Sequence, residues 1–239
     1  MLFFTPIEAV VPMRSTASEA AEQVSQLLYG EIAESHLPQE GNWQYIRCLH
    51  DGYEGWVDAK MIREISAEQA DTFRTWQPNT HRNYSIPQAD GSPLWLPIGA
   101  RISTESTAYF SVEEMLAFGR TLLNTPYLWG GRSSFGIDCS GLMQILFAMR
   151  GILLPRDASQ QGKVGQEIPF AEIAAGDVVF CSKPGKTNIS HVGVLLAPDQ
   201  ILHASGRVRI DFLTENGVIH SQNQQLTHSL VYIRRFSPV

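Results

Sequence analysis

The chain lacks an excess of positive charge. Its 239 residues include 18 lysines and arginines against 24 aspartates and glutamates, which gives a net charge of -6. General nucleic-acid binders are normally basic, so the charge balance disfavours that class of function. It also disfavours attachment to an anionic polymer by charge alone. A small soluble ligand or substrate fits this composition better.

Long hydrophobic runs are also missing, and none approaches the roughly 20 residues that a membrane-spanning helix needs. The N-terminal stretch MLFFTPIEAVVPM is apolar but short. It has neither a basic flank nor a cleavage site of small residues, so we interpret it as a strand and not as a signal peptide. The sequence therefore predicts a cytoplasmic protein, or an exported one if a leader precedes the residues given.

Cysteine is scarce, with three residues scattered at positions 48, 139 and 181. Three cysteines are too few and too scattered for a disulfide framework, and an odd number leaves at least one thiol free. A zinc site made from Cys139, Cys181, His191 and His203 has suitable ligand types, but no CxxC or HxxxH spacing supports it. We therefore expect no metal and no cofactor.

The first 65 residues are rich in short β-patterned runs. VVPMR and YIRCL are such runs, GYEGWVD alternates around glycines, and the turn signals EGN and HDG fall between these three runs. This pattern resembles a bacterial SH3-like barrel, which predicts a domain over residues 1–65. Residues 66–109 are either a linker or part of a second SH3-like unit, with LWLPIGARI as one more strand.

The pattern changes to helices at Ser111, which begins a capping box with Glu114. The amphipathic helix that follows is expected to stop at Asn124 and Pro126. A second helix, from about residue 140 to 150, is apolar almost all round and is therefore expected to be buried. Five strand candidates come next: DVVFC, HVGVLLA, QILHA, RVRIDFL and SLVYIRRF. Helices followed by antiparallel strands predict an α+β domain over residues 110–239.

Cys139 lies between a glycine-rich turn and the second helix. The first turn of a helix offers free N–H groups and the positive end of the helix dipole, both of which favour a thiolate. A thiol pKa lowered in this way is typical of reactive cysteines. The same N–H groups can bind a developing oxyanion. The competing interpretation is a structural cysteine, which position alone does not exclude.

Two histidines in adjacent strands favour the catalytic interpretation. His191 and His203 are joined through a turn at residues 197–199. If Gly193 pairs with His203, three residues form the loop, and the two histidines share a sheet face as diagonal neighbours. A two-residue loop would place the two histidines on opposite faces of the sheet, so the triad requires the three-residue loop. Five histidines in turn-like or polar contexts receive no role: His36, His50, His81, His220 and His228.

At this point the chain resembles the NlpC-type family of cell-wall cysteine peptidases over roughly residues 110–237. The resemblance rests on YLWGGRSSFGIDCSGLMQILFAMRG, LPRDASQQ, AAGDVVF, HVGVLL and LHASG, in that order. It implies a reduced papain-like fold with a central antiparallel sheet. It also implies a hydrolase in which Cys139 is the nucleophile, His191 is its base and His203 orients that base.

The resemblance also implies a substrate. The family cleaves the bond between γ-linked D-glutamate and a diamino acid in wall peptides. In members with SH3-like domains the barrel closes one end of the cleft, which implies short peptides with a free N-terminal L-alanine and a role in murein peptide recycling or turnover. The expected partner is this small peptide, bound by a monomer. Diaminopimelate and lysine remain equally open as the diamino acid.

Six residues are candidates for substrate contacts. The Tyr127 hydroxyl is expected to join the Cys139 N–H in the oxyanion hole, and Trp129 to lie beside it. Asp138 and Asp157 could bind the substrate ammonium with help from Ser140, and Tyr53 could close the pocket.

Each candidate also has a structural interpretation. Asp138 could be a helix cap, Asp157 could pair with Arg156, and the aromatic residues could belong to the cores. Arg132, in the glycine-rich turn, is expected to be a solvated surface arginine.

Two other classes of function remain. The first is a cell-wall peptide-binding module with an inactive papain-like domain, which the intact Cys/His/His set disfavours. The second is an acyltransferase or amidase on the same fold, for which a long apolar groove is expected. Two carboxylates near the nucleophile suit a peptide with a free ammonium better.

Overall fold

The structure, a computed structural model, describes residues 1–104 and 108–237. It contains two compact units. The first comprises Met1–Ala108 and Leu128–Gly136, and the second comprises Tyr109–Tyr127 and Ile137–Val239. Within the described ranges, every helix is too short or too polar to cross a membrane.

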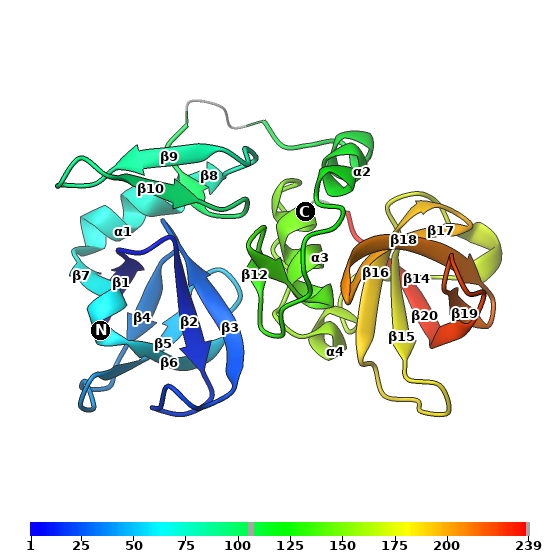
Figure 1. Cartoon of the computed structure of the whole chain (residues 1–239), viewed down its shortest axis with the longest axis horizontal. Coiled ribbons are helices and arrows are strands. Elements are labelled where there is room, and N and C mark those ends of the chain that lie inside the picture. The colour runs from blue at the N-terminus through cyan, green and yellow to red at the C-terminus, as the bar shows by residue number, and fades with distance from the viewer. Residues whose placement is uncertain (105–107, 238–239) are drawn as a thin grey trace. The chain divides into compact units, whose positions relative to one another are not determined.

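The first unit is built around a seven-stranded sheet with the order β3-β2-β6-β5-β4-β1-β7 (Figure 1). Its elements are β1 (Leu2–Pro6), β2 (Val10–Arg14), β3 (Gln23–Leu28), β4 (Ala33–Ser35), β5 (Trp43–Cys48), β6 (Glu54–Asp58), the 3-10 turn η1 (Ala59–Met61) and β7 (Ile62–Ile65). Buried and less buried side chains alternate along β2 and β6, and Val11, Met13 and Val57 meet in the core. The N-terminal stretch forms two strands where one was expected, because the chain turns at residues 7–9 around the exposed Glu8.

Residues 66–104 belong to the first unit. Helix α1 (Ala67–Arg74) begins at Ser66, which forms a capping box with Gln69. Short strands follow: β8 (Gln77–Pro78), β9 (Tyr84–Pro87), β10 (Pro93–Leu96) and β11 (Arg101–Ile102). The expectation of one strand over LWLPIGARI is wrong, because β10 pairs with β9 and β11 pairs with β8. Pro97 cannot donate to a ladder and Gly99 has a φ of 97°, so the chain turns between them.

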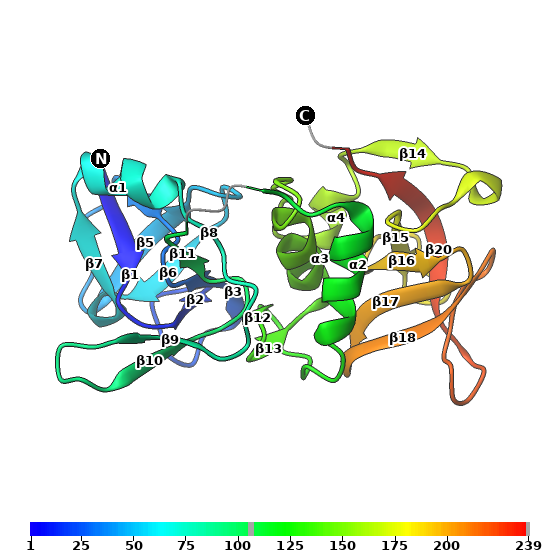
Figure 2. The ribbon, with the colours of Figure 1, turned by 90° about the horizontal axis from the view of Figure 1, so that it is seen from above.

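Three helices belong to the second unit: α2 (Val112–Thr121), α3 (Cys139–Ala148) and α4 (Ala158–Gln161). The predicted capping box of α2 is confirmed, since Ser111 accepts from the Glu114 N–H and the Glu114 carboxylate accepts from the Ser111 N–H. The residues of α3 are buried from Cys139 to Phe147, as its apolar sequence predicts. Helix α3 packs against α2 and against two strands of the second unit, β16 (His191–Ala197) and β17 (Gln200–Ser205) (Figure 2).

The strands of the second unit form a curled antiparallel sheet. They are β14 (Gln166–Ile168), β15 (Val178–Ser182), β16 (His191–Ala197), β17 (Gln200–Ser205), β18 (Arg207–Thr214), β19 (Gly217–Ile219) and β20 (Leu226–Arg235), with η2 (Phe170–Glu172) after β14. Because β19 also pairs with β20, the run from β15 to β20 closes into a ring, and β14 attaches to β20. The five predicted strands are present, and the short β14 and β19 were not predicted. A small hairpin, β12 (Arg132–Ser133) and β13 (Gly136–Ile137), precedes α3.

One face of this sheet carries both a hydrophobic core and the candidate histidines. Leu195, Ile201 and Leu213 belong to one buried cluster. Side chains alternate along a strand, so His203 shares the face of Ile201. His191 is paired with Cys181, a member of the same cluster, and paired residues lie on the same face. The side chains beside the two histidines on this face are packed in a hydrophobic core. This packing holds the strands that carry His191 and His203 in place.

Candidate active site

Cys139 is the first residue of α3, as predicted, and is 6% exposed. The backbone N–H groups of Val192 and Ser140 hydrogen-bond its sulfur and favour the thiolate. Burial and the nearby Asp138 carboxylate nevertheless raise the pKa of the Cys139 thiol to about 12. The expected lowering of this pKa is therefore wrong for the resting protein, because desolvation outweighs the N–H groups. The resting group is a thiol, and a base must remove its proton during attack.

Asp138 is held in a buried hydrogen-bond network at the start of α3. One of its oxygens accepts from the Gly141 N–H at 2.7 Å, which caps the helix. The other accepts from Arg156 at 2.5 Å, with both side chains almost fully buried. Arg156 also donates to the Ser140 hydroxyl, which itself lies 3.2 Å from Asp138. The helix-cap interpretation of Asp138 is confirmed, and Asp138 also forms an ion pair with Arg156.

His191 and His203 lie side by side as the triad requires. Gly193 pairs with His203, and His191 Nε2 lies 2.7 Å from His203 Nδ1. The prediction that three residues form the loop between the two strands is wrong, although the connection does contain an extra residue. Ala197 pairs with Gln200 across a two-residue turn, and the register shifts between Leu195 and Ala197. A β-bulge thus supplies the extra residue that puts both histidines on one face.

Gly193 makes room for this pair. A methyl group built on its Cα would lie 2.8 Å from His203 Cβ and 2.8 Å from the Ile201 side chain. Contacts this short do not occur between real side chains. The glycine of the HVG motif therefore allows the His203 side chain to sit directly over strand β16, within reach of His191.

We expect Gly193→Ala to displace His203, because Ile201 behind it is fully buried and cannot yield. Overpacking of this kind costs about 1–3 kcal/mol of folding free energy. Thermal unfolding should show the lower stability, and peptide cleavage assays should show a loss of kcat/KM larger than the unfolded fraction explains. Wild-type values for both would mean that the strand has room for a side chain here.

Asp211 fixes the hydrogen positions along the histidine pair. Its Oδ2 lies 3.0 Å from His203 Nε2, and its carboxylate also accepts from Arg209 and from the Ser221 N–H. These hydrogen bonds outweigh burial and hold the pKa of Asp211 well below its usual range, so it is an ionised acceptor. His203 must then donate from Nε2 and accept at Nδ1. His191 in turn donates from Nε2, which leaves its Nδ1 with a lone pair.

Both histidines are neutral at pH 7. Burial lowers the pKa of His191 well below 6.5, and the neighbouring His203 and His228 lower it further. Burial also lowers the pKa of His203, against the opposing effect of Asp211. A neutral imidazole with a free lone pair is the form of histidine that can accept a proton. The chain from Asp211 through His203 to His191 thus presents a general base.

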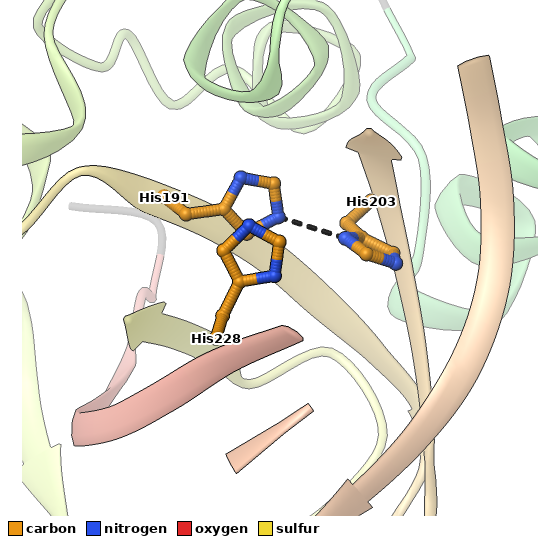
Figure 3. A group of neighbouring side chains, drawn as sticks. All are labelled: His191, His203 and His228. Atoms are coloured by element: carbon orange, nitrogen blue, oxygen red, sulfur yellow. Dashed lines mark hydrogen bonds between the residues drawn. The ribbon is translucent and has the colours of Figure 1, made fainter. Parts of the chain in front are cut away.

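His228, on β20, stacks on the ring of His191 (Figure 3) with centroids 3.9 Å apart and an angle of 16° between the planes. The second ring nitrogen of His191 lies on the side away from His203 (Figure 3). Ligand nitrogens of the three histidines lie within 4.8 Å of one another, so this group has the donor types for a divalent transition metal. In the structure His191 and His203 use two of these nitrogens to bind each other.

Known proteins resemble this chain in both units. The NlpC/P60 family profile matches residues 124–230, and that of the bacterial dipeptidyl-peptidase SH3 domain matches residues 13–62. The Probable endopeptidase NlpC of Escherichia coli (strain K12) is 32% identical over 126 residues, which cover 52% of this chain and 75% of that protein. The chain belongs to the NlpC/P60 family.

Two further relatives extend the likeness. The gamma-D-glutamyl-L-lysine dipeptidyl-peptidase of Bacillus subtilis (strain 168) is 41% identical over 95 residues. The match covers 39% of this chain but only 32% of that protein. The crystal structure of an NlpC/P60 family protein from Bacillus cereus ATCC 10987 has a TM-score of 0.82 at 17% identity, covering 99% of this chain and 100% of that one. This NlpC/P60 family protein therefore shares its fold with nearly the whole chain.

The two predicted oxyanion-hole residues of this NlpC/P60 protein, Cys139 and Tyr127, lie in the second unit, whereas Trp129 lies in the first. Tyr127 is half-buried in the second unit, where burial, then Cys139 and Asp138, raise its phenol pKa above the usual range. It therefore stays a hydrogen-bond donor at every physiological pH. Trp129 belongs to the first unit, and its indole N–H donates to Glu22 at 2.7 Å. This contact gives Trp129 a structural partner, and its role toward substrate stays a prediction.

The remaining candidates also have defined places. Asp157 is half-buried before α4 and does not cap that helix through its side chain. Tyr53 packs against the core of the first unit, so its predicted substrate contact stays a prediction. The expectation that Arg132 is solvated is wrong. It is 6% exposed, and its guanidinium binds both oxygens of Glu31 at 2.9 and 3.0 Å.

Sequence reasoning missed two residues of the site. Asp211 shares a strand face with His203, and the period-2 pattern of RVRIDFL could have suggested it. His228 reaches His191 through the ring closure of β19 and β20, which no local pattern indicates. Both residues come from the last strands of the NlpC/P60 unit.

Proposed function

We propose that this chain is a cysteine peptidase that cleaves the γ-D-glutamyl–diamino acid bond of short peptidoglycan peptides. The observation that carries the proposal is the buried chain of hydrogen bonds from Asp211 through His203 to His191, beside a cysteine at a helix N-terminus. This arrangement of nucleophile, base and orienting group is the one that acyl transfer needs. The name of one relative, a gamma-D-glutamyl-L-lysine dipeptidyl-peptidase, supports the substrate class, and the name of another, a Probable endopeptidase, supports peptide hydrolysis.

The reaction begins with the neutral thiol and the neutral imidazole. His191 Nδ1 takes the thiol proton as the Cys139 sulfur attacks the γ-carbonyl carbon of D-glutamate. The carbonyl oxygen becomes an oxyanion, for which the Cys139 N–H and the neutral Tyr127 hydroxyl are the proposed donors. Transient charge on His191 is stabilised by His203 and, through it, by the ionised Asp211.

Collapse of the tetrahedral intermediate breaks the C–N bond. His191 returns its proton to the amine of the departing diamino acid, and an acyl-thioester with Cys139 remains. Water then attacks this thioester while His191 accepts a proton from it. The thiol is restored, and L-Ala-D-Glu leaves. Each proton is taken and given back by the same imidazole.

We further propose that the substrate enters with a free N-terminal amine, which Asp157 binds. Asp157 directly precedes α4, which packs against α3, the helix that begins at Cys139. Asp157 is half-buried in the same unit as Cys139. A carboxylate there would bind an ammonium group by a charge-assisted hydrogen bond.

The test compares L-Ala-γ-D-Glu-diaminopimelate with its N-acetylated form. We expect the wild-type protein to cleave the free-amine peptide preferentially, and Asp157→Asn to lower kcat/KM for that peptide by about 10- to 100-fold, as loss of a charged hydrogen bond predicts. The N-acetylated peptide should be affected little.

Asp199→Asn, at the exposed β16–β17 turn, removes the same charge elsewhere in the second unit and serves as the control. Equal losses on both peptides with Asp157→Asn would remove Asp157 from amine recognition. Cleavage of neither peptide by the wild-type protein would contradict the proposed function itself.

A further inference from the structure

The second unit contains a cavity of about 500 Å³ that the mechanism above does not use. It lies where β17 ends and β18 begins, and the β19–β20 loop and the segment after α2 complete its wall. Its volume is in the range of sites that hold small molecules. We call this cavity the arginine pocket. Its polar lining consists mainly of Asn124, Arg207, Arg209, His220, Ser221 and Gln222.

The lining of the arginine pocket favours an anion. Among the described residues that line it, none is acidic. Arg207 is exposed at the start of β18 and Arg209 is half-buried two residues later, so both lie on one face of the strand. A guanidinium group binds an edge of two oxygens through two parallel hydrogen bonds. A carboxylate has one such edge, whereas a phosphate group can offer a separate edge to each arginine. The pocket therefore suits a phosphate group best.

Two residues of the arginine pocket also bind Asp211. Arg209 Nε donates to Asp211 Oδ2 at 2.9 Å, Nη2 lies at the same distance, and the Ser221 N–H donates to Oδ1 at 3.0 Å. Asp211 Oδ2 in turn lies 3.0 Å from His203 Nε2. One carboxylate thus joins the pocket to the histidine that orients the base. Neither contact of Arg209 uses Nη1, so its outer edge can bind a ligand while Nε keeps its bond to Asp211.

We propose that the arginine pocket binds a phosphate group, free or as a monoester, and that the bound anion acts on the catalytic base through Arg209. The binding site goes beyond the proposed function, whereas its effect on turnover rests on that function. The positive charge of Arg209 opposes protonation of both His191 and His203. A phosphate group bound to Arg209 offsets this charge. His191 then becomes protonated, and is lost as a base, at a higher pH.

The other groups around the two histidines keep their effects when the anion binds. His228 on β20 opposes protonation of His191, His220 in the β19–β20 loop opposes protonation of His203, and Asp211 favours the protonation of both. Two thiols also lie here: Cys181 is paired with His191, and the Cys139 sulfur accepts from the Val192 N–H. Burial raises the pKa of each thiol to about 12, so both are uncharged. Of these groups, Arg209 and His220 line the pocket.

Calorimetric titration of the wild-type protein with inorganic phosphate, at an ionic strength held constant with chloride, tests the binding site. Arg207→Ala should weaken phosphate binding about 10-fold, the effect of losing one charge-assisted hydrogen bond. Arg120→Ala removes an exposed arginine from α2 and should bind phosphate as the wild-type protein does. Acetate should bind more weakly than phosphate. The inference is overturned if Arg207→Ala binds phosphate unchanged, or if acetate binds as tightly as phosphate.

Glycerol 3-phosphate distinguishes the two sources of the phosphate group. Binding tighter than that of inorganic phosphate, and weakened to the same extent by Arg207→Ala, identifies a monoester as the ligand. Weaker binding identifies the free ion.

The effect on the base is read from kcat/KM for L-Ala-γ-D-Glu-diaminopimelate across pH, in saturating phosphate and in chloride. For the wild-type protein, the fall at low pH should move up by about half a pH unit in phosphate, a fraction of the roughly 1–3 units that a charge in direct contact produces. Arg207→Ala should show no such shift at the same phosphate concentration. A phosphate effect that persists in Arg207→Ala, or none in the wild-type protein, overturns the link to the base. Failure to cleave the peptide would contradict the proposed function, and the titrations would still decide the binding site.

Discussion

The Cys139→Ala variant is expected to lose at least about 10⁴-fold in kcat/KM while keeping the fold, the loss typical of removing a covalent nucleophile. The substitution deletes only the sulfur atom that attacks the carbonyl carbon. The helix that carries it is capped by Asp138 and held by Arg156, and neither contact involves the thiol. Cleavage of L-Ala-γ-D-Glu-diaminopimelate should therefore fall to background while the thermal unfolding midpoint changes little.

Cys48→Ala is the matched control for this variant. Cys48 is also a buried cysteine, but it lies in the core of the first unit. Its substitution should change stability slightly and leave the turnover of folded protein intact. A Cys139→Ala variant that cleaved peptide at a substantial fraction of the wild-type rate would remove Cys139 from the chemistry, whatever the control showed.

The parts of the fold that follow local rules were predictable from the sequence. The capping box at Ser111 and the apolar run after Cys139 each depend on residues within one or two helical turns, and both helices occur where expected. The pairing of Gly193 with His203 was also predictable, because two apolar strands joined by a short turn have few possible registers. These local features suffice to place Cys139, His191 and His203.

Features that depend on distant contacts were not predictable in this way. Arg132 is buried because Glu31, about a hundred residues earlier in the chain, offers its carboxylate. His228 stacks on His191 only because β20 closes the ring of strands. The raised pKa of Cys139 likewise follows from burial by other elements, which outweighs the local effect of the helix N-terminus. Contacts between elements far apart in the sequence therefore determine the burial of Arg132 and the protonation state of Cys139, which local sequence patterns did not predict correctly.

His191→Ala should lower kcat/KM by more than His203→Ala, because one side chain transfers the proton and the other positions it. General-base catalysis contributes roughly 10²–10⁴ in rate, and His191→Ala should lose that contribution. His203→Asn should recover part of the activity lost in His203→Ala, because a carboxamide oxygen can accept the His191 Nε2–H. Equal losses for all three variants would mean that His203 acts through more than this hydrogen bond.

Asp211→Asn tests the same series of hydrogen bonds, from Asp211 through His203 to His191, at the end farthest from Cys139. A carboxamide can donate to His203 Nε2, which would place the His203 proton on Nδ1 and reverse the hydrogen bond to His191. His191 would then carry its proton on Nδ1 and could not accept one from Cys139. We expect a loss within the range of His203→Ala, with the Ser221 N–H still able to hold the side chain through its remaining carbonyl oxygen. Unchanged activity would show that the ionised Asp211 does not set the tautomer.

The pH dependence of kcat/KM should report the same base. The proton acceptor is neutral His191, and burial together with His203 and His228 holds its pKa well below 6.5. Activity should therefore persist below pH 6.5 and fall only as His191 becomes protonated at lower pH. His228→Phe keeps an aromatic ring stacked on His191 but removes one group that opposes its protonation. The fall of kcat/KM at low pH should then occur at a higher pH than in the wild-type protein. If it occurred at the same pH, His228 would contribute to the site by packing only.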